Sequence, residues 1–477
     1  MSRATRMVGL LVVVFAVVSC ARTLLRLPPA DASVDGGQSD AGDGGVGFDA
    51  GDAGSGGKFE AWGAPFRISD GDAGFASSVA VSRYAWASSD VIWSTSSGAS
   101  VSLWGARVDT DGGVSFLQRL AEFDGGVIIN PRVSSAPNFT VSAATFLYAS
   151  TLDAGSPREL WAARRDGSWF PTALLSNSGS VTFPSLAQVG AETFLATWMS
   201  YSDYGSMRIA RSDGASPVWI DAGSLDGGNP ILRGASMGEN YMPNTENSGP
   251  IVTALNNCIM QMGQMSCQVT VQWTAGDTWQ TPYRADTLGG EIWASPFVGA
   301  ANGQATVAWL KAGLDFFSGE LWAARCNTGG CSSQQMIKSF PYVNPEFMSG
   351  DGPTGIDVKQ NVGTASLIVW AERDAGVFMS HSSGFGTAWT SPMKIADKPA
   401  DKPVANPISG DLFGAAWREG TNIVVTWITS GTTAANLAPI SVFGGASTIT
   451  DLKISAGEKP VLLVWVADGV VWGVWAQ

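Results

Sequence analysis

The sequence predicts an all-β protein that folds as an eight-bladed β-propeller, a ring of four-stranded sheets. The first observation is composition: the 477 residues include 20 Trp and 58 Gly, and only 14% are charged, which suits strands and tight turns better than helices. The second is a pattern of four short strands that recurs every 47–61 residues, a spacing typical of propeller blades. Eight units lie between Trp62 and Gln477; seven is the alternative count, because the fourth and seventh units are the least regular.

The recurrence is clearest at the ends of the second strands. These positions are Trp93, Tyr148, Trp198, Leu255, Trp309, Trp370, Trp417 and Trp465. A single sheet of this kind cannot cover both of its apolar faces, whereas sheets stacked around an axis bury them against one another. Turns such as 111–113 (Asp-Gly-Gly) supply the positive-φ positions that tight hairpins need.

The C-terminal stretch predicts how the ring closes. Residues 451–456, 459–467 and 469–476 form a three-strand pattern that lacks the fourth strand of the other units. A segment of the missing type, residues 62–68, lies at the other end of the repeats. We therefore expect this N-terminal strand to pair with the C-terminal blade, so that backbone hydrogen bonds close the ring and leave no free sheet edge there.

The N-terminal residues indicate export. Arg3 and Arg6 precede the apolar run 7–18, which is too short to span a bilayer and is typical of a signal peptide. The run ends in Val17-Val18-Ser19-Cys20, which resembles the lipobox of bacterial lipoproteins. The resemblance implies acylation of Cys20, and several acyl chains on one residue anchor a protein stably. An ordinary cleaved signal peptide is the alternative.

These features divide the chain into three parts. Residues 1–19 are a lipoprotein signal peptide, and residues 20–57 are the lipidated Cys followed by a disordered linker rich in Gly, Asp and Ala. Residues 58–477 are the propeller. The resemblance places the protein in the cell envelope, on the periplasmic or the surface-exposed side. Ala21 is not the Asp of the inner-membrane retention signal, which favours the outer membrane.

Charge and cysteine content limit the partners. The net charge of −13 argues against a nucleic acid, and contact with the membrane is expected through the lipid anchor only. The four Cys after Cys20 are expected to form two local disulfides, Cys258–Cys267 and Cys326–Cys331. A zinc site needs Cys and His clusters with short spacing, and the chain has a single His. We predict neither a metal nor a cofactor.

Some units also resemble the Asp-box repeats of sialidase-like propellers. The resemblance is carried by Ser383 to Ile395, with Trp389 and Pro392, and by Ser212-Asp213-Gly214 followed by Trp219. It implies the fold only, because in that family the box stabilises a turn.

A sialidase-like enzyme would need three Arg side chains that bind a carboxylate. The sequence Phe66-Arg67-Ile68-Ser69 resembles the Phe-Arg-Ile-Pro motif that carries the first of these, with Ser69 in place of Pro. The strand that closes the ring is a sufficient explanation for it. Arg107, Arg164, Arg211 and Arg325 recur at equivalent third-strand positions, so we expect them to serve the blades, for example by stacking on neighbouring Trp.

Catalytic residues are not predicted. There is no Gly-x-Ser-x-Gly elbow, and His381 at a strand end is interpreted as a surface residue. A ligand-binding rim is expected where second strands join third strands on one face of the ring. The candidate residues are Tyr201, Asp203, Tyr204, Asp315, Phe316, Phe317 and Arg373.

Aromatic side chains together with acids and a base suit sugar or peptide recognition. The predicted function is a non-enzymatic binding or scaffold module for a protein or a glycan. The alternatives are a sialidase-like carbohydrate-active enzyme and a structural surface protein without a small ligand.

Overall fold

The computed structural model describes residues 61–476, apart from short internal stretches. The stretches left out are 70–73, 86, 136–140, 151–156, 177–180, 189–191, 201–205, 213–217, 226–230, 239, 242–251, 262–263, 276–277, 287–295, 302, 313–317, 342, 345–348, 351–352, 362–364, 373–374, 385–387, 398, 410, 434–436 and 456–459. The predicted signal peptide and linker, with Cys20, lie outside the described residues. Residues 60–477 form one compact unit. Within the described part, no helix has the length and apolar character needed to cross a bilayer.

All regular elements of the described residues are β-strands, and they form eight blades. Blade 1 contains β2 (Phe75–Ala85), β3 (Ser88–Ser97), β4 (Ser100–Asp109) and β5 (Val114–Asp124). Blade 2 contains β6 (Val127–Ser135), β7 (Val141–Ala149), β8 (Arg158–Asp166) and β10 (Ala173–Ser176), and β9 (Ser168–Trp169) also pairs with β8. Blade 3 contains β11 (Val181–Gln188), β12 (Phe194–Ser200), β13 (Ser206–Ser212) and β14 (Trp219–Leu225). Blade 4 contains β15 (Ile231–Gly238), β17 (Val252–Gln261), β18 (Gln264–Ala275) and β20 (Tyr283–Arg284), with β19 (Thr278–Trp279) paired with β18.

The second half repeats the plan. Blade 5 contains β21 (Phe297–Ala301), β22 (Gln304–Ala312), β23 (Gly319–Asn327) and β25 (Gln335–Phe340), with β24 (Gly330–Cys331) paired with β23. The small sheet of β26 (Val343–Asn344) and β27 (Ser349–Gly350) follows. Blade 6 contains β28 (Pro353–Gln360), β29 (Ser366–Glu372), β30 (Gly376–Ser382) and β31 (Met393–Ala396). Blade 7 contains β32 (Ala400–Ser409), β33 (Leu412–Glu419), β34 (Asn422–Ile428) and β35 (Ile440–Phe443). Blade 8 contains β36 (Ile449–Ile454), β37 (Val461–Ala467), β38 (Val470–Ala476) and β1 (Phe66–Arg67).

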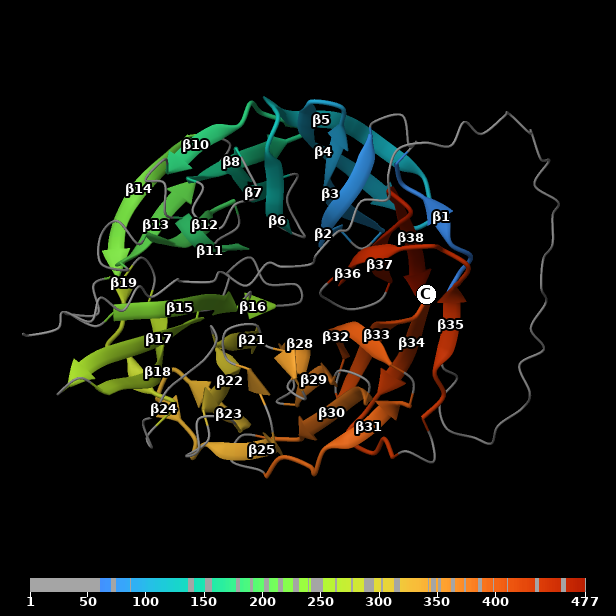
Figure 1. The fold of residues 1–477 in the computed structure, drawn as a ribbon. Coiled ribbons are helices and arrows are strands. Elements are labelled where there is room, and N and C mark those ends of the chain that lie inside the picture. Colours follow the sequence, from blue (N-terminus) through green and yellow to red (C-terminus); the bar gives the residue numbers. More distant parts are fainter. Residues whose placement is uncertain are drawn as a thin grey trace, which may run out of the picture. The chain divides into compact units, whose positions relative to one another are not determined.

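The first strands of the blades form a closed circle. Each contacts the first strand of the next blade, in the order β2, β6, β11, β15, β21, β28, β32, β36 and back to β2. Figure 1 shows these strands toward the middle of the ring and the fourth strands β5, β10, β14, β25, β31 and β35 at its periphery. The predicted eight-bladed propeller is therefore confirmed.

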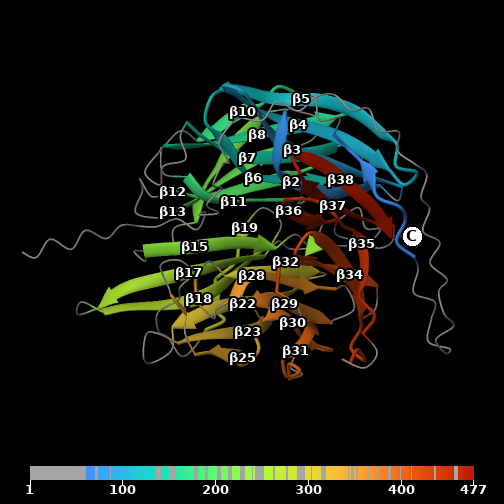
Figure 2. The ribbon, with the colours of Figure 1, turned by 45° about the vertical axis from the view of Figure 1, so that its right-hand side comes forward.

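Blade 8 is closed by the N-terminal strand, as predicted. Phe66 pairs with Gly473 and Arg67 with Trp472 in antiparallel register, and an isolated bridge joins Trp62 to Ala476. Figure 2 shows the red C-terminal strands beside the blue strands of blade 1. The two ends of the repeat region thus share one sheet.

The hydrophobic core lies between adjacent blades. The predicted second-strand positions Trp309, Trp370 and Trp465 are completely buried, and the clusters around them combine residues of neighbouring blades. Blade 4 departs from the pattern, since its buried Trp273 stands on the third strand, opposite Val252. A tryptophan on either central strand fills the same layer between sheets.

We call the face where second strands join third strands the loop face. On the opposite face the first strands join the second strands, and the third join the fourth. Residues between β15 and β17 add a short strand, β16 (Asn240–Tyr241), which pairs in parallel with the inner edge of β21. Blade 5 therefore has an extra strand on the axial side (Figure 1). It lies near the opposite face, because it pairs with the last two residues of β21.

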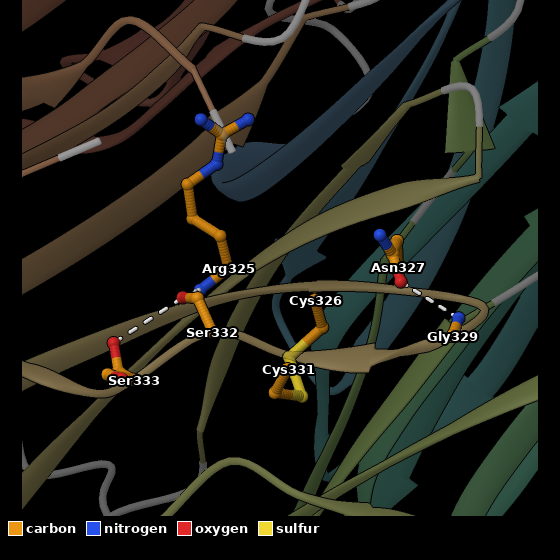
Figure 3. The surroundings of a disulfide bond; sticks show 7 residues. All are labelled: Arg325, Cys326, Asn327, Gly329, Cys331, Ser332 and Ser333. Atoms are coloured by element: carbon orange, nitrogen blue, oxygen red, sulfur yellow. Dashed lines mark hydrogen bonds between the residues drawn. A yellow bond between two sulfur atoms is a disulfide. The ribbon is translucent and has the colours of Figure 1, made fainter. Parts of the chain in front are cut away.

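One of the two predicted disulfides is present in the described side chains. Cys326 and Cys331 face each other in the β23–β24 pair, with 4.0 Å between their Cα atoms, and are bonded (Figure 3). Cys258 and Cys267 also stand directly opposite in the register of β17 and β18. Their side chains lie outside the described part, so the second disulfide stays a prediction.

Candidate functional site

The residues of the predicted ligand-binding rim lie outside the described residues. They are Tyr201, Asp203, Tyr204, Asp315, Phe316, Phe317 and Arg373. Their segments join β12 to β13, β22 to β23 and β29 to β30. Each is a connection from a second to a third strand, so the strand ends on either side of it lie on the loop face of blades 3, 5 and 6.

The described part of the loop face carries a cluster of charged side chains where blade 7 meets blade 8. This charged cluster consists of Asp401, Lys402, Arg418, Asp451 and Lys453. Arg418, at the end of β33, binds both carboxylate oxygens of Asp401 and donates from Nη1 to the carbonyl oxygen of Ile449 at 2.6 Å. Three cations and two anions give the cluster an excess of one positive charge.

Lys402 has an unusual backbone within this cluster. Its φ of 52° lies in the left-handed region, and the pairing of β32 with β33 shifts register between Asp401 and Val404. A non-glycine residue in this conformation is strained, and such strain is characteristic of functional positions. The bulge directs the Lys402 ammonium across the blade boundary, where it donates to the carbonyl oxygen of Thr450.

The electrostatic environment of Lys402 is also unusual. Burial lowers the pKa of its ammonium below the usual value, and the charges of Asp451 and Asp401 offset this only in part. Burial raises the pKa of the Asp451 carboxyl, but the charge and hydrogen bond of Lys453 and the backbone N–H of Val79 outweigh it, so this pKa is lowered overall. Burial therefore acts on both Lys402 and Asp451, so the cluster is partly removed from water.

The cluster continues into blade 1. The Asp451 carboxylate accepts the N–H of Val79 at 3.0 Å, and the Thr450 hydroxyl donates to the carbonyl oxygen of Ser77 at 3.2 Å. At the start of the same strand Phe75 is half exposed, and it lies against Gly469 in the turn between β37 and β38. The described loop face thus combines charges, hydroxyl groups and one exposed aromatic ring.

Two of the recurrent arginines, Arg164 and Arg325, join neighbouring blades, which refines the prediction that they serve the blades. Arg164 of blade 2 donates to the hydroxyl of Ser212 at 2.8 Å and to the carbonyl oxygen of Glu192 at 2.6 Å, both near blade 3. Its guanidinium stacks over Phe194, so the aromatic partner is a phenylalanine and not the expected tryptophan. Arg325 of blade 5 reaches Gln360 of blade 6 in the same way, and burial lowers its pKa to about 10.

Blades 1 and 2 are joined through a buried carboxylate, whereas Arg164 and Arg325 bind uncharged oxygen atoms of the neighbouring blade. Asp90 is fully buried and binds Arg165 of blade 2, with Arg107 at 3.4 Å. It also accepts hydrogen bonds from the hydroxyls of Ser135 and Ser142. A buried carboxylate with this many partners fixes the two blades to each other, because its charge has no alternative solvation there.

His381 is part of a blade contact and not of a catalytic triad. Its Nε2 lies 2.8 Å from the backbone carbonyl oxygen of Ser430 in blade 7, and its Nδ1 lies 3.4 Å from the hydroxyl of Thr390. The Ser430 hydroxyl donates to Asp411 instead of to the imidazole. Catalysis by a serine needs a hydrogen bond from its hydroxyl to the imidazole. Here the Ser430 hydroxyl is bound to a carboxylate, and the imidazole contacts only the Ser430 backbone, so this pair is missing.

Arg67 lies on the outermost strand of blade 8, where its guanidinium is 5.8 Å from the centre of the Trp472 ring. This position, remote from the first strands at the axis, is that of a residue of the closing strand. Ser69 has a role of its own, since its hydroxyl accepts the N–H of Val471 at 2.9 Å. This hydrogen bond explains why a serine occupies the position that is Pro in the Phe-Arg-Ile-Pro motif, because proline has no hydroxyl to accept it.

Sequence reasoning missed the charged cluster. A signal for it exists, because an Asp-x-Lys unit occurs in two first strands, at 357–359 and 451–453. In both units the carboxylate accepts the N–H of the next residue and one N–H of the next blade, namely that of Ala405 or Val79. Asp-x-Lys in a first strand therefore marks a carboxylate that links two blades.

Comparison with protein-family models gives no match, and comparison with curated proteins gives none either. Among solved structures, the Dos1 propeller is similar to 88% of this chain over 95% of its own length, with a TM-score of 0.51 and 10% identity. At this identity the similarity shows the fold alone.

Two further structures are similar at lower TM-scores. The α-L-arabinofuranosidase arb93a from Fusarium graminearum has a TM-score of 0.38 and 13% identity, and covers 62% of this chain over 92% of its own. Sqt1 from Chaetomium thermophilum has a TM-score of 0.45 and 12% identity, and covers 85% of this chain over 97% of its own.

Proposed function

We propose that this protein is a lipid-anchored, non-enzymatic binding module of the cell envelope. In this proposal the acylated Cys20 and the linker 20–57 hold the propeller at a membrane, the outer membrane being favoured. The loop face engages a protein or a glycan. The observation that supports the proposal is that the strand ends flanking three aromatic and charged connections lie on the loop face of blades 3, 5 and 6, the face that also carries the charged cluster.

The architecture supports binding through loops. The ring is closed by β1, and buried polar contacts such as Asp90–Arg165 and Arg164–Ser212 join neighbouring blades. Loops on a rigid scaffold present binding side chains at little conformational cost on association. The charged cluster adds a partly desolvated ammonium, a group that pairs well with an anionic part of a partner.

A binding experiment tests the proposal. Full-length protein carrying Tyr201→Ala and Tyr204→Ala, and a second variant carrying Phe316→Ala and Phe317→Ala, are compared with the wild type in crosslinking on native envelopes and on a glycan array. Ser441→Ala on the outer strand β35 is the control. We expect the wild type and the control to retain a partner that both loop variants lose.

Two outcomes would contradict the proposal. Equal binding by all four proteins would show that the loop face is not the binding surface. Release of sugar from an arrayed glycan by the wild type would identify the alternative, a carbohydrate-active enzyme. Acylation is tested separately: we expect Cys20→Ser to abolish incorporation of radiolabelled fatty acid and to release the protein from membranes.

A further inference from the structure

The first strands share an irregularity near the loop face. In seven of the eight blades, a shift of register interrupts the pairing of the first strand with the second. Such β-bulges re-aim side chains and are frequent next to binding sites. In the consecutive blades 7, 8, 1 and 2 the polar bulged residues, which we call the axial bulges, are Lys402, Thr450, Ser77 and Asn130.

The axial bulges lie at one level of the ring. The residue directly before each bulge pairs with one of the last three residues of the second strand, which ends on the loop face. These pairs are Asp401 with Arg418, Ile449 with Ala467, Ala76 with Thr95 and Ile129 with Leu147. Because the first strands form the inner circle of the ring, the bulges surround the axis on the side of the loop face (Figure 1).

Two of the axial bulges have the same backbone conformation. Asn130 and Lys402 have φ values of 50° and 52°, and each is followed by a proline, Pro131 or Pro403. A non-glycine residue is strained in this left-handed region, and the following proline restricts the bulge further. Strain of this kind at equivalent positions of blades 2 and 7 is characteristic of a functional site.

The axial bulges of three blades are joined by hydrogen bonds. The Lys402 ammonium donates to the carbonyl oxygen of Thr450, and the Thr450 hydroxyl donates to the carbonyl oxygen of Ser77 at 3.2 Å. The hydroxyl of Ser77, an exposed residue, lies 2.9 Å from that of Ser94. The bulges of blades 7, 8 and 1 therefore form one continuous polar surface beside the axis.

Lys402 retains donors for a ligand. An ammonium has three N–H groups, and within the described part only one of those of Lys402 has an acceptor, the carbonyl group in blade 8. The carboxylates near it have partners of their own, because Asp401 binds Arg418 and Asp451 binds Lys453. Since Lys402 is partly removed from water, its charge attracts an anion more strongly than that of a fully solvated lysine.

Blade 2 supplies a second cation. Arg132 follows Asn130 by two positions in β6, and both residues are exposed. Among the described residues, neither side chain has a hydrogen bond or an ion pair. Lys402 and Arg132 thus stand on either side of blades 8 and 1, and they place two available positive charges at the axis of a protein whose net charge is −13.

We propose that the axial bulges and Arg132 bind a phosphorylated glycan. Its phosphate group pairs with Lys402 and Arg132, and its hydroxyl groups contact the hydroxyl and amide side chains of the other bulges. A phosphate monoester carries a charge of about −1.5 to −2 at pH 7, which matches two cations, whereas a carboxylate supplies only one charge. The proposal rests on the loop face as the binding surface and narrows the proposed function to one class of glycan.

Isothermal titration calorimetry on the full-length protein tests the ligand class. The probes are glucose 6-phosphate, glucuronate as the monoanion and glucose as the neutral sugar. We expect glucose 6-phosphate to bind at least about tenfold more tightly than the other two, and its affinity to fall below about pH 6 as the phosphate takes up a proton. Equal affinities for glucose 6-phosphate and glucuronate, or binding of none of the probes, would overturn the proposal.

Substitutions test the residues. Arg132→Gln and Lys402→Gln should each weaken the binding of glucose 6-phosphate about tenfold, because each removes one charge-assisted contact. Arg119→Gln on the outer strand β5, where Arg119 pairs with the exposed Glu122, is the matched control and should bind like the wild type. Arg132 has no described contact to lose, so this variant tests binding even if Lys402→Gln unfolds. Unchanged affinity in Arg132→Gln would refute the site.

Two further comparisons separate this proposal from its alternatives. Binding of the Cys20→Ser chain to phosphatidic acid vesicles that glucose 6-phosphate does not displace would assign the site to a lipid headgroup and overturn the proposal. If Arg132→Gln loses glucose 6-phosphate while Tyr201→Ala/Tyr204→Ala keeps the envelope partner, the phosphate site stands and the loop partner falls. The reverse result rejects the phosphate site alone.

Discussion

The hydroxyl of Ser69 accepts a hydrogen bond from the backbone N–H of Val471 at 2.9 Å, across 402 positions of the sequence. Ser69 is buried, and the N–H of Ile68 donates to the carbonyl oxygen of the same Val471 at 2.8 Å. The segment that closes the ring is therefore held by the Ser69 side chain as well as by backbone hydrogen bonds.

Ser69→Ala should destabilise the propeller. The substitution leaves the buried N–H of Val471 without its acceptor, which costs about 1–3 kcal/mol of the free energy of unfolding. Urea denaturation followed by tryptophan fluorescence measures the change. Ser441→Ala, at an exposed position, is the control, and equal midpoints for the two variants would contradict the role given to Ser69.

Asp90→Asn should be more damaging than any surface change. Removal of one partner from a buried ion pair costs about 3–5 kcal/mol, because Arg165 then stays charged in the interior. Asp397→Asn is the matched control, since Asp397 pairs with Lys394 at an almost fully exposed position. Urea unfolding of both variants decides: a loss below about 1 kcal/mol for Asp90→Asn would show that the pair is not a structural link.

Lys402 offers a test of backbone strain. Lys402→Gly and Lys402→Ala both remove the ammonium, but only glycine adopts a φ of 52° without strain. We expect the glycine variant to be the more stable of the two by about 1 kcal/mol, although glycine loses more entropy on folding. Thermal and urea denaturation compare them, and a more stable alanine variant would indicate that the bulge relaxes.

Asp468 should make stability depend on pH. Hydrogen bonds from the Ser447 side chain, opposed by slight burial and supported by the N–H groups of Ser447 and Thr448, hold the pKa of its carboxyl below the usual value. The group therefore stabilises the fold above the pKa of the unfolded chain, and this contribution is lost as the pH falls through the folded-state pKa. We expect the melting temperature of the wild type to exceed that of Asp468→Asn at pH 7 and the difference to narrow below about pH 4. A constant difference would contradict the assignment.

The Cys326–Cys331 disulfide should contribute about 2 kcal/mol to the free energy of unfolding, as expected for a closed loop with a sequence separation of 5. Reduction should lower the urea midpoint of the wild type. In the double variant Cys326→Ala/Cys331→Ala, any change of the urea midpoint on reduction then reports on the pair Cys258 and Cys267 alone. Peptide mass mapping under non-reducing conditions should show both pairs, and a crossed pairing would refute the second prediction.

The repeat pattern was sufficient to predict the architecture, because burial between blades acts on every unit alike. It predicted the second strand that carries the buried Trp465, and it predicted that the segment 62–68 pairs with the C-terminal blade. The pattern did not predict blade 4 correctly. There the tryptophan between the sheets is Trp273 on the third strand, and the second-strand position of the repeat is occupied by Leu255. Packing between two sheets requires side chains of a certain total volume, but a large side chain on either central strand can supply it.

The polar contacts were beyond sequence reasoning. Asp90 follows two serines and reads as part of a turn, yet it is buried by Arg165, 75 positions further along. Lys402 looks like a surface charge until the bulge and blade 8 place it beside Thr450. These contacts of Asp90 and Lys402 depend on the register between strands of different blades, and they lack a local pattern such as the Asp-x-Lys units.

The two-residue strand β1 has a mechanical consequence. Any force transmitted through the residues before Trp62 acts first on the bridge from Trp62 to Ala476. It then acts on Phe66, Arg67 and the Ser69 hydroxyl, which help to hold the ring shut. Tension on the N-terminal segment and opening of the ring are therefore coupled. We expect a stretched molecule to begin unfolding where the closing strand pairs with β38.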